Sequence, residues 1–205
     1  MRLDGGHPAL DLVNTVYGQP GKPPEHDVLA EPADLTTFAG RVGACADGTP
    51  AGTAALRAAR ELRGALNAIL EARIAGERPP PDEAASLAAA GRAALAAGRL
   101  VESEGAIAWT WPADDPHAPV HRLALAALEL LASADDLARL RRCAGCRWFF
   151  LDRSRGSGRR WCSMADCGTE AKKRRYVARR RERLKSSAGR PDRGLTATPD
   201  IHVRS

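Results

Sequence analysis

The chain has 205 residues, enough for one medium domain and a small second one, and its 44% hydrophobic residues can form a core. No run of about 18 apolar residues is present, and residues 1–10 lack the apolar centre of a signal peptide, so we expect a cytoplasmic protein without a transmembrane helix. The net charge of +6 hides two opposed parts: residues 1–140 carry 12 basic and 19 acidic residues, whereas residues 141–185 carry 16 basic and 4 acidic. This asymmetry indicates a polyanionic partner.

Helices dominate the predicted body, residues 1–138. Leu10, Val13 and Tyr17 fall on one helical stripe after Pro8, although the alternation at Leu10 and Leu12 also fits a short strand. Residues 100–111 alternate around a Glu/Gly turn and predict a β-hairpin. Four further helices are predicted: residues 32–44; residues 53–75, with Thr53 as N-cap and Gly76 as stop; residues 82–97, capped by Asp82; and the apolar core helix 118–133.

The body offers only a weak candidate for a ligand site. His7 and Asn14 lie beside the first apolar stripe and could line the pocket of a small-molecule effector. The simpler interpretation makes Asn14 a buried amide that fixes a neighbouring turn and His7 a cap or surface residue. Phosphate-binding loop, nucleophile-elbow and metalloprotease motifs are missing from the sequence, so we do not expect an enzyme. The body would instead sense an effector or form a homodimer.

Four of the five cysteines lie within residues 143–167, in the pattern Cys-x2-Cys, fifteen residues, Cys-x4-Cys. Each pair can chelate through a tight turn, and four thiolates favour one structural Zn²⁺ held by Cys143, Cys146, Cys162 and Cys167. Two disulfides, a redox Cys-x-x-Cys motif and an iron–sulfur cluster remain alternatives. Cys45 is distant in sequence, and we interpret it as a small buried hydrophobic residue.

The sequence of residues 139–185 predicts a small zinc finger followed by a basic helix. Residues 147–152 and 159–162 would form a β-hairpin between the two cysteine pairs, as in treble-clef modules. Its aromatic residues, Trp148, Phe149, Phe150 and Trp161, would form a miniature core or stack on bases. So small a unit needs metal to fold.

The basic helix is predicted over residues 169–185, with Thr169 as its cap and Ala171, Ala178 and Tyr176 or Val177 facing the zinc unit. Dense like charge at helical spacing is costly unless an anion compensates it, and a phosphate backbone is such an anion. A solvated basic tail is the alternative. Disorder is expected for residues 186–205. The candidate nucleic-acid-binding residues are Arg147, Arg159, Arg160, Lys172, Lys173, Arg174, Arg175, Arg179, Arg180 and Arg181, with Arg159, Arg160 or Lys173 as base readers.

The order of the Cys-x2-Cys pair, an aromatic segment, residues 161–168 (Trp-Cys-Ser-Met-Ala-Asp-Cys-Gly) and a Lys/Arg helix resembles the CGNR zinc-finger family, in which the finger follows an ABATE domain. Residues 10–16 look like the opening of that domain. The resemblance covers residues 5–185 and implies a bacterial, stress-responsive transcription regulator with zinc in the finger and DNA as its target. The name-giving Asn and Arg are here Thr169 and Glu170, so any base or phosphate contact that the family makes at these two positions is not carried over to this chain.

The sequence therefore predicts a mainly α protein: a helical N-terminal domain with one β-hairpin, then a treble-clef-like zinc finger made of a β-hairpin and a basic helix. The predicted function is that of a zinc-binding, DNA-binding transcription regulator. Two alternatives remain. The basic finger could dock on an acidic protein, or it could bind structured RNA.

Overall fold

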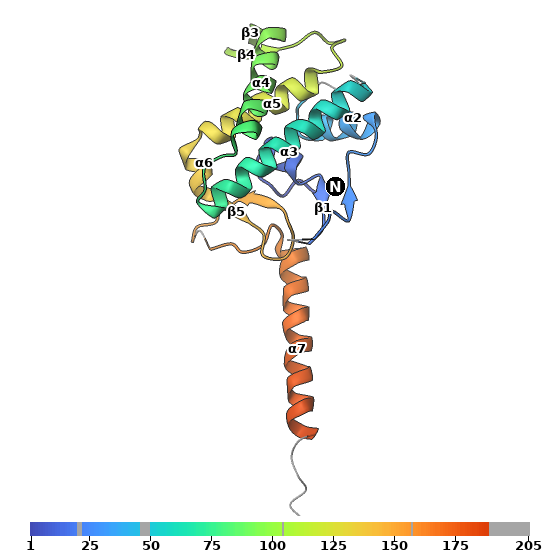
Figure 1. Ribbon diagram of the computed structural model, residues 1–205, viewed down its shortest axis with the longest axis vertical. Helices are drawn as coiled ribbons and strands as arrows, with labels where there is room; N and C mark the ends of the chain where they lie inside the picture. Colours follow the sequence, from blue (N-terminus) through green and yellow to red (C-terminus); the bar gives the residue numbers. More distant parts are fainter. Residues whose placement is uncertain (20–21, 46–49, 104, 157, 189–205) are drawn as a thin grey trace, which may run out of the picture.

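The computed structural model describes residues 1–19, 22–45, 50–103, 105–156 and 158–188. Within these residues the body is a bundle of helices α1 to α6, and helix α7 stands away from it (Figure 1). The fold is mainly α with small two-stranded sheets, as the sequence predicted. No helix in the described part of the chain is long and apolar enough to cross a membrane. The helices are α1 Pro8–Val13, α2 Pro32–Arg41, α3 Thr53–Ala75, α4 Pro81–Ala97, α5 Ala118–Ala132, α6 Ala134–Arg139 and α7 Thr169–Ala188.

The long body helices follow their predicted bounds closely, because local signals specify their ends. α3 ends at Gly76, whose left-handed backbone (φ 74°) favours glycine, but its N-cap is Gly52 rather than the predicted Thr53. α4 begins after Pro80, so Asp82 lies in its first turn and is not its cap. α2 ends at Arg41, short of the predicted residue 44, because Gly43 turns the chain at φ 70°.

The described ranges also contain three antiparallel strand pairs: β1 Val16–Tyr17 with β2 His26–Asp27, β3 Arg99–Ser103 with β4 Ala106–Thr110, and β5 Leu140–Arg142 with β6 Phe149–Leu151. The β3–β4 pair confirms the predicted hairpin. Tyr17 pairs with His26 in β1, so its predicted place on the first helical stripe is wrong. The helix stops at Val13 because the Thr15 hydroxyl donates to the Leu12 carbonyl and the chain turns.

The hairpin of the finger differs from the prediction. β6 pairs with β5, so the hairpin encloses the first cysteine pair instead of lying between the two pairs. Residues 158–162 form no strand. The buried Asp152 carboxylate accepts hydrogen bonds from the Ser154 and Arg159 backbone N–H groups. A side chain therefore organises this segment as a loop, in place of a strand ladder.

The finger and the body share one hydrophobic core. Leu140, Phe149 and Leu151 belong to the same buried cluster as Leu10 and Leu66 of the body. Phe150 points the other way, as strand alternation requires, and packs with Trp148, Cys143 and Cys162 in a second, smaller cluster. Strand β6 thus has its two faces in two different cores, which fixes the finger against the bundle.

Helix α7 leads away from both cores (Figure 1). Of residues 169–184, whose side chains the structure describes, only Ala171 is buried. The predicted packing of Ala178, Tyr176 and Val177 against the zinc unit is therefore wrong, because the helix axis carries them into solvent. Most of the tail predicted to be disordered, residues 189–205, lies outside the described residues.

Candidate metal centre and nucleic-acid interface

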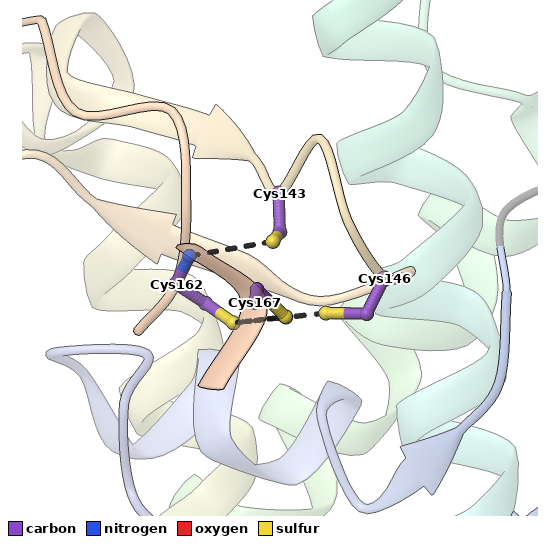
Figure 2. A group of neighbouring side chains, drawn as sticks. All are labelled: Cys143, Cys146, Cys162 and Cys167. Carbon is purple, nitrogen blue, oxygen red and sulfur yellow. Dashed lines mark hydrogen bonds between the residues drawn. The ribbon is translucent and has the colours of Figure 1, made fainter. Parts of the chain in front are cut away.

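The four predicted cysteine ligands converge on one point (Figure 2). Their sulfur atoms all lie within 4.8 Å of one another. The Cys146–Cys162 and Cys162–Cys167 sulfur pairs are 3.6 and 3.7 Å apart. A tetrahedral Zn²⁺ with bonds of about 2.3 Å places its sulfur ligands about 3.8 Å apart, whereas a disulfide needs about 2.05 Å. The sulfurs therefore fit one closed, four-coordinate zinc site.

Backbone hydrogen bonds in two short segments position these sulfurs. The Cys143 N–H donates to the Trp148 carbonyl (2.9 Å) and closes the turn between β5 and β6. The Cys143 sulfur accepts N–H bonds from Gly145 (3.4 Å) and Cys162 (3.3 Å), which stabilise a thiolate at this position. One ligand pair thus supplies backbone donors to the other, and the hairpin and the second pair form a single unit.

The second pair opens helix α7. Cys162 precedes a π-helical turn, η1 (Met164–Gly168), which contains Cys167 and continues into α7. The Ser163 hydroxyl accepts from the Asp166 N–H and caps this turn. Thr169 is therefore not the predicted cap, and its hydroxyl donates to the Met164 carbonyl instead. Because Cys167 lies in the turn that begins the helix, the metal site sets the direction of α7.

The thiols interact strongly at this spacing. Hydrogen bonds donated by the Cys146 and Cys162 thiols lower the pKa of Cys143. The same hydrogen bond to Cys143 raises the pKa of Cys146 to about 12, and the pKa values of Cys162 and Cys167 are raised as well. Four ionised sulfurs this close together need a cation to balance them. A divalent ion that accepts soft ligands supplies that charge.

Asn14 connects the body to the finger. Its Nδ2 donates to the Phe149 carbonyl (2.8 Å), and its Oδ1 accepts from the Phe149 N–H (2.9 Å), so one side chain pairs with the outer edge of β6. Asn14 is only 1% exposed. The Trp148 indole N–H donates to the Val16 carbonyl nearby, and Tyr17 packs edge-on against Trp148. Both polar groups of the Asn14 amide are thus engaged within the protein.

His7 has a local role in the geometry. Its Nδ1 accepts from the Ala9 N–H (3.3 Å) at the N-cap of α1, and burial lowers the pKa of the imidazole. The side chains of both predicted pocket residues, His7 and Asn14, are therefore hydrogen-bonded to backbone groups of the chain itself.

Arg159 turns inward. Its guanidinium donates to the carbonyls of Trp161 and Cys162 and lies 4.7 Å from the centre of the Phe150 ring. It braces the loop that carries the second ligand pair. Nothing in the sequence marks it out from its neighbour Arg160, which is exposed.

Arg147 is partly buried, and its Nη1 has no hydrogen-bond partner among the described residues.

The remaining predicted contact residues are exposed and gather on or beside α7. Arg160 lies at the base of the helix, with its guanidinium 5.4 Å from the centre of the Trp161 ring. The others follow along the helix: Lys172, Lys173, Arg174, Arg175, Arg179, Arg180 and Arg181. None of these eight side chains forms a salt bridge within the described part of the chain.

Gly168, next to the last ligand, is closely surrounded by side chains. A Cβ at this position would lie 2.9 Å from the Met164 sulfur and 3.3 Å from Cδ1 of Trp161. Thr169 and Glu170 are both exposed. A larger residue at position 168 would have to displace Met164 and Trp161, whereas the exposed positions 169 and 170 leave room for other side chains.

Comparisons with known families agree with this organisation. The family model ABATE, described as "Putative stress-induced transcription regulator", matches residues 6–134, and the CGNR zinc finger model matches residues 139–180. Neither is an enzyme family. No curated protein matched the chain. The chain therefore belongs to the ABATE family and carries a CGNR zinc finger whose four cysteines suit one structural zinc ion.

Proposed function

We propose that the protein is a DNA-binding transcription regulator whose helix α7 contacts the phosphates of duplex DNA. The observation that carries this proposal is the projecting helix itself. Between residues 169 and 184, α7 presents eight exposed Lys or Arg side chains against two acidic ones, beyond both hydrophobic cores (Figure 1). Such a helix gains little from packing, and a polyanion compensates its charge.

The distribution of charge around α7 supports duplex DNA over a flat acidic protein surface. At about 100° per residue, Lys173 and Arg180 lie on the face opposite to Ala171, Arg174 and Arg175 lie on either side of Ala171, and the other cations fill the sides. A partner on one face would use only part of this charge. The major groove, about 12 Å wide, admits a helix and has phosphates along both walls. Helix α7, at about 1.5 Å per residue over twenty residues, is long enough to cross it.

The zinc site would act as the base of this helix. Cys167 lies in η1, and η1 continues directly into α7, so the metal would fix the direction in which the helix leaves the body. The body is held to the same base through Asn14 and β6. If the body binds a small-molecule effector or forms a homodimer, as the sequence predicted, this connection would pass the effect on to the DNA-binding helix. The two alternatives, RNA and an acidic protein, are outcomes of the test below.

Affinity of the full chain for duplex DNA, measured across a salt series, tests the proposal. If most of the eight cations meet phosphates, log K should fall against log salt with a slope of about −5 to −7. The Arg179→Ala/Arg180→Ala variant should reduce the magnitude of the slope by about 2, since each contact contributes about 0.9. Arg57→Ala on α3, an exposed cation of the body, should leave the slope unchanged.

The comparison of ligands decides between the candidates. A steeper slope and tighter binding for an RNA hairpin of equal length would assign the protein to RNA. Weak binding to both nucleic acids, with a slope near zero, would refute the proposal and favour an acidic protein partner.

A further inference from the structure

A cleft lies where the zinc-binding hairpin meets the first turns of α7. Its volume is about 450 Å³, within the range of sites for small ligands and single phosphate-bearing groups. It is separate from the sulfur cluster, although Gly145 borders both: a Cβ on Gly145 would lie 3.4 Å from the Cys167 sulfur. The lining residues are Gln19, Ala144, Gly145, Arg160, Trp161, Ala171, Arg174 and Arg175.

Three arginine residues from two elements line this cleft. Arg160 comes from the loop before Cys162, while Arg174 and Arg175 come from α7. None of the three forms a salt bridge in the described part of the chain, and no acidic residue is among the lining residues. Three arginines with no acidic residue beside them give the cleft a positive potential.

The cleft is built by fixed elements. Ala171 is buried, and Arg174 and Arg175 follow it at i+3 and i+4, so the three share one face of the helix. The Ala144 N–H donates to the Arg160 carbonyl (3.0 Å), which ties the cysteine turn to the opposite wall. The Arg160 guanidinium lies over the Trp161 ring. Because this contact already holds the Arg160 side chain in place, less side-chain entropy is lost when Arg160 binds a ligand.

We infer that this cleft binds one phosphodiester group of the DNA backbone and sets the register of α7 on the duplex, an inference that rests on the function proposed above. A phosphate offers several acceptor oxygens, and guanidinium groups bind them in bidentate fashion. The cations farther along α7 are surrounded by water, and salt screens their contacts. In the cleft, one phosphate would meet three arginines at once, with Trp161 and Gly145 as walls, so this contact should persist at higher salt than the single contacts along the helix.

Two charge-matched variants test this inference. Arg174→Ala/Arg175→Ala removes two cations of the cleft, and Lys173→Ala/Arg180→Ala removes two from the opposite face of the same helix. Each variant should reduce the magnitude of the slope of log K against log salt by about 2, because each loses two cations. Affinity extrapolated to 1 M salt, where counterion release no longer contributes, should fall at least tenfold in the cleft variant and stay unchanged in the control variant. All four substituted side chains are exposed, so both proteins should fold and keep their zinc.

A third variant separates geometry from charge. Arg160→Lys keeps the cation but loses the bidentate fork and the stacking on Trp161, so it should lower the extrapolated affinity without changing the slope. Equal extrapolated affinities for the cleft and control variants would overturn the cleft inference and leave DNA binding by α7 intact. Failure of the unaltered protein to bind DNA would overturn both. Inorganic phosphate or a mononucleotide that displaces DNA from the unaltered protein, but not from the cleft variant, would assign the cleft to a free phosphate ligand instead.

Discussion

Replacing Asn14 with alanine should destabilise the protein strongly, because it leaves two buried backbone groups of Phe149 without partners. The bonds that are lost measure 2.8 and 2.9 Å, and the side chain is 1% exposed, so water cannot replace them. Each unpaired buried group costs about 1–3 kcal/mol. The free energy of unfolding should therefore fall by about 2–6 kcal/mol, a large share of the 5–15 kcal/mol typical of folded domains at about 25 °C.

Urea unfolding followed by tryptophan fluorescence and far-UV circular dichroism measures this loss. Asn67→Ala provides the matched control: Asn67 is a partly exposed residue in the middle of α3, and its removal should change the stability by no more than about 0.5 kcal/mol. Zinc competition with a chelator gives a second readout, since β6 follows the first cysteine pair. Equal stabilities for the two variants would show that the Asn14 amide does not hold the finger to the body.

The remaining predictions concern metal, pH and the basic helix. Cys162→Ala should abolish zinc binding, detected by elemental analysis, and protease should then cleave residues 140–168 before α3; retention of stoichiometric zinc would contradict the four-cysteine site. Burial raises the pKa of Asp11 to about 6, so its contribution to stability is full below a pH of about 4 and is lost as the pH rises through about 6. Asp11→Asn should remove this loss, raising the Tm at pH 7 more than at pH 4, and an equal change at both pH values would count against it. In α7, phosphates should relieve repulsion between like charges such as Arg175 and Arg179, so saturating duplex DNA should raise the temperature at which the helical circular dichroism melts; an unchanged melting temperature would count against phosphate contacts along the helix.

Much of the fold could be predicted because its signals are local. The apolar spacing in α3 and the glycine after it specify a helix and its end within a few residues of chain. The cysteine pairs are equally local, since each chelates through one turn, and their sulfurs meet as predicted. The position of Arg159 was not predictable in this way. Its sequence context is the same as that of Arg160, yet one side chain braces the metal loop and the other is exposed.

The sequence by itself determined the helices, the zinc ligands and the basic character of α7, because periodicity, chelate spacing and charge depend only on near neighbours in the chain. Only the tertiary structure decided which strand β6 pairs with and what Asn14 holds. Asn14 and Phe149 are 135 positions apart, and no local pattern specifies which of many buried backbone groups an amide will meet. That choice depends on how β6 packs between two cores, and it is what joins the finger to the body.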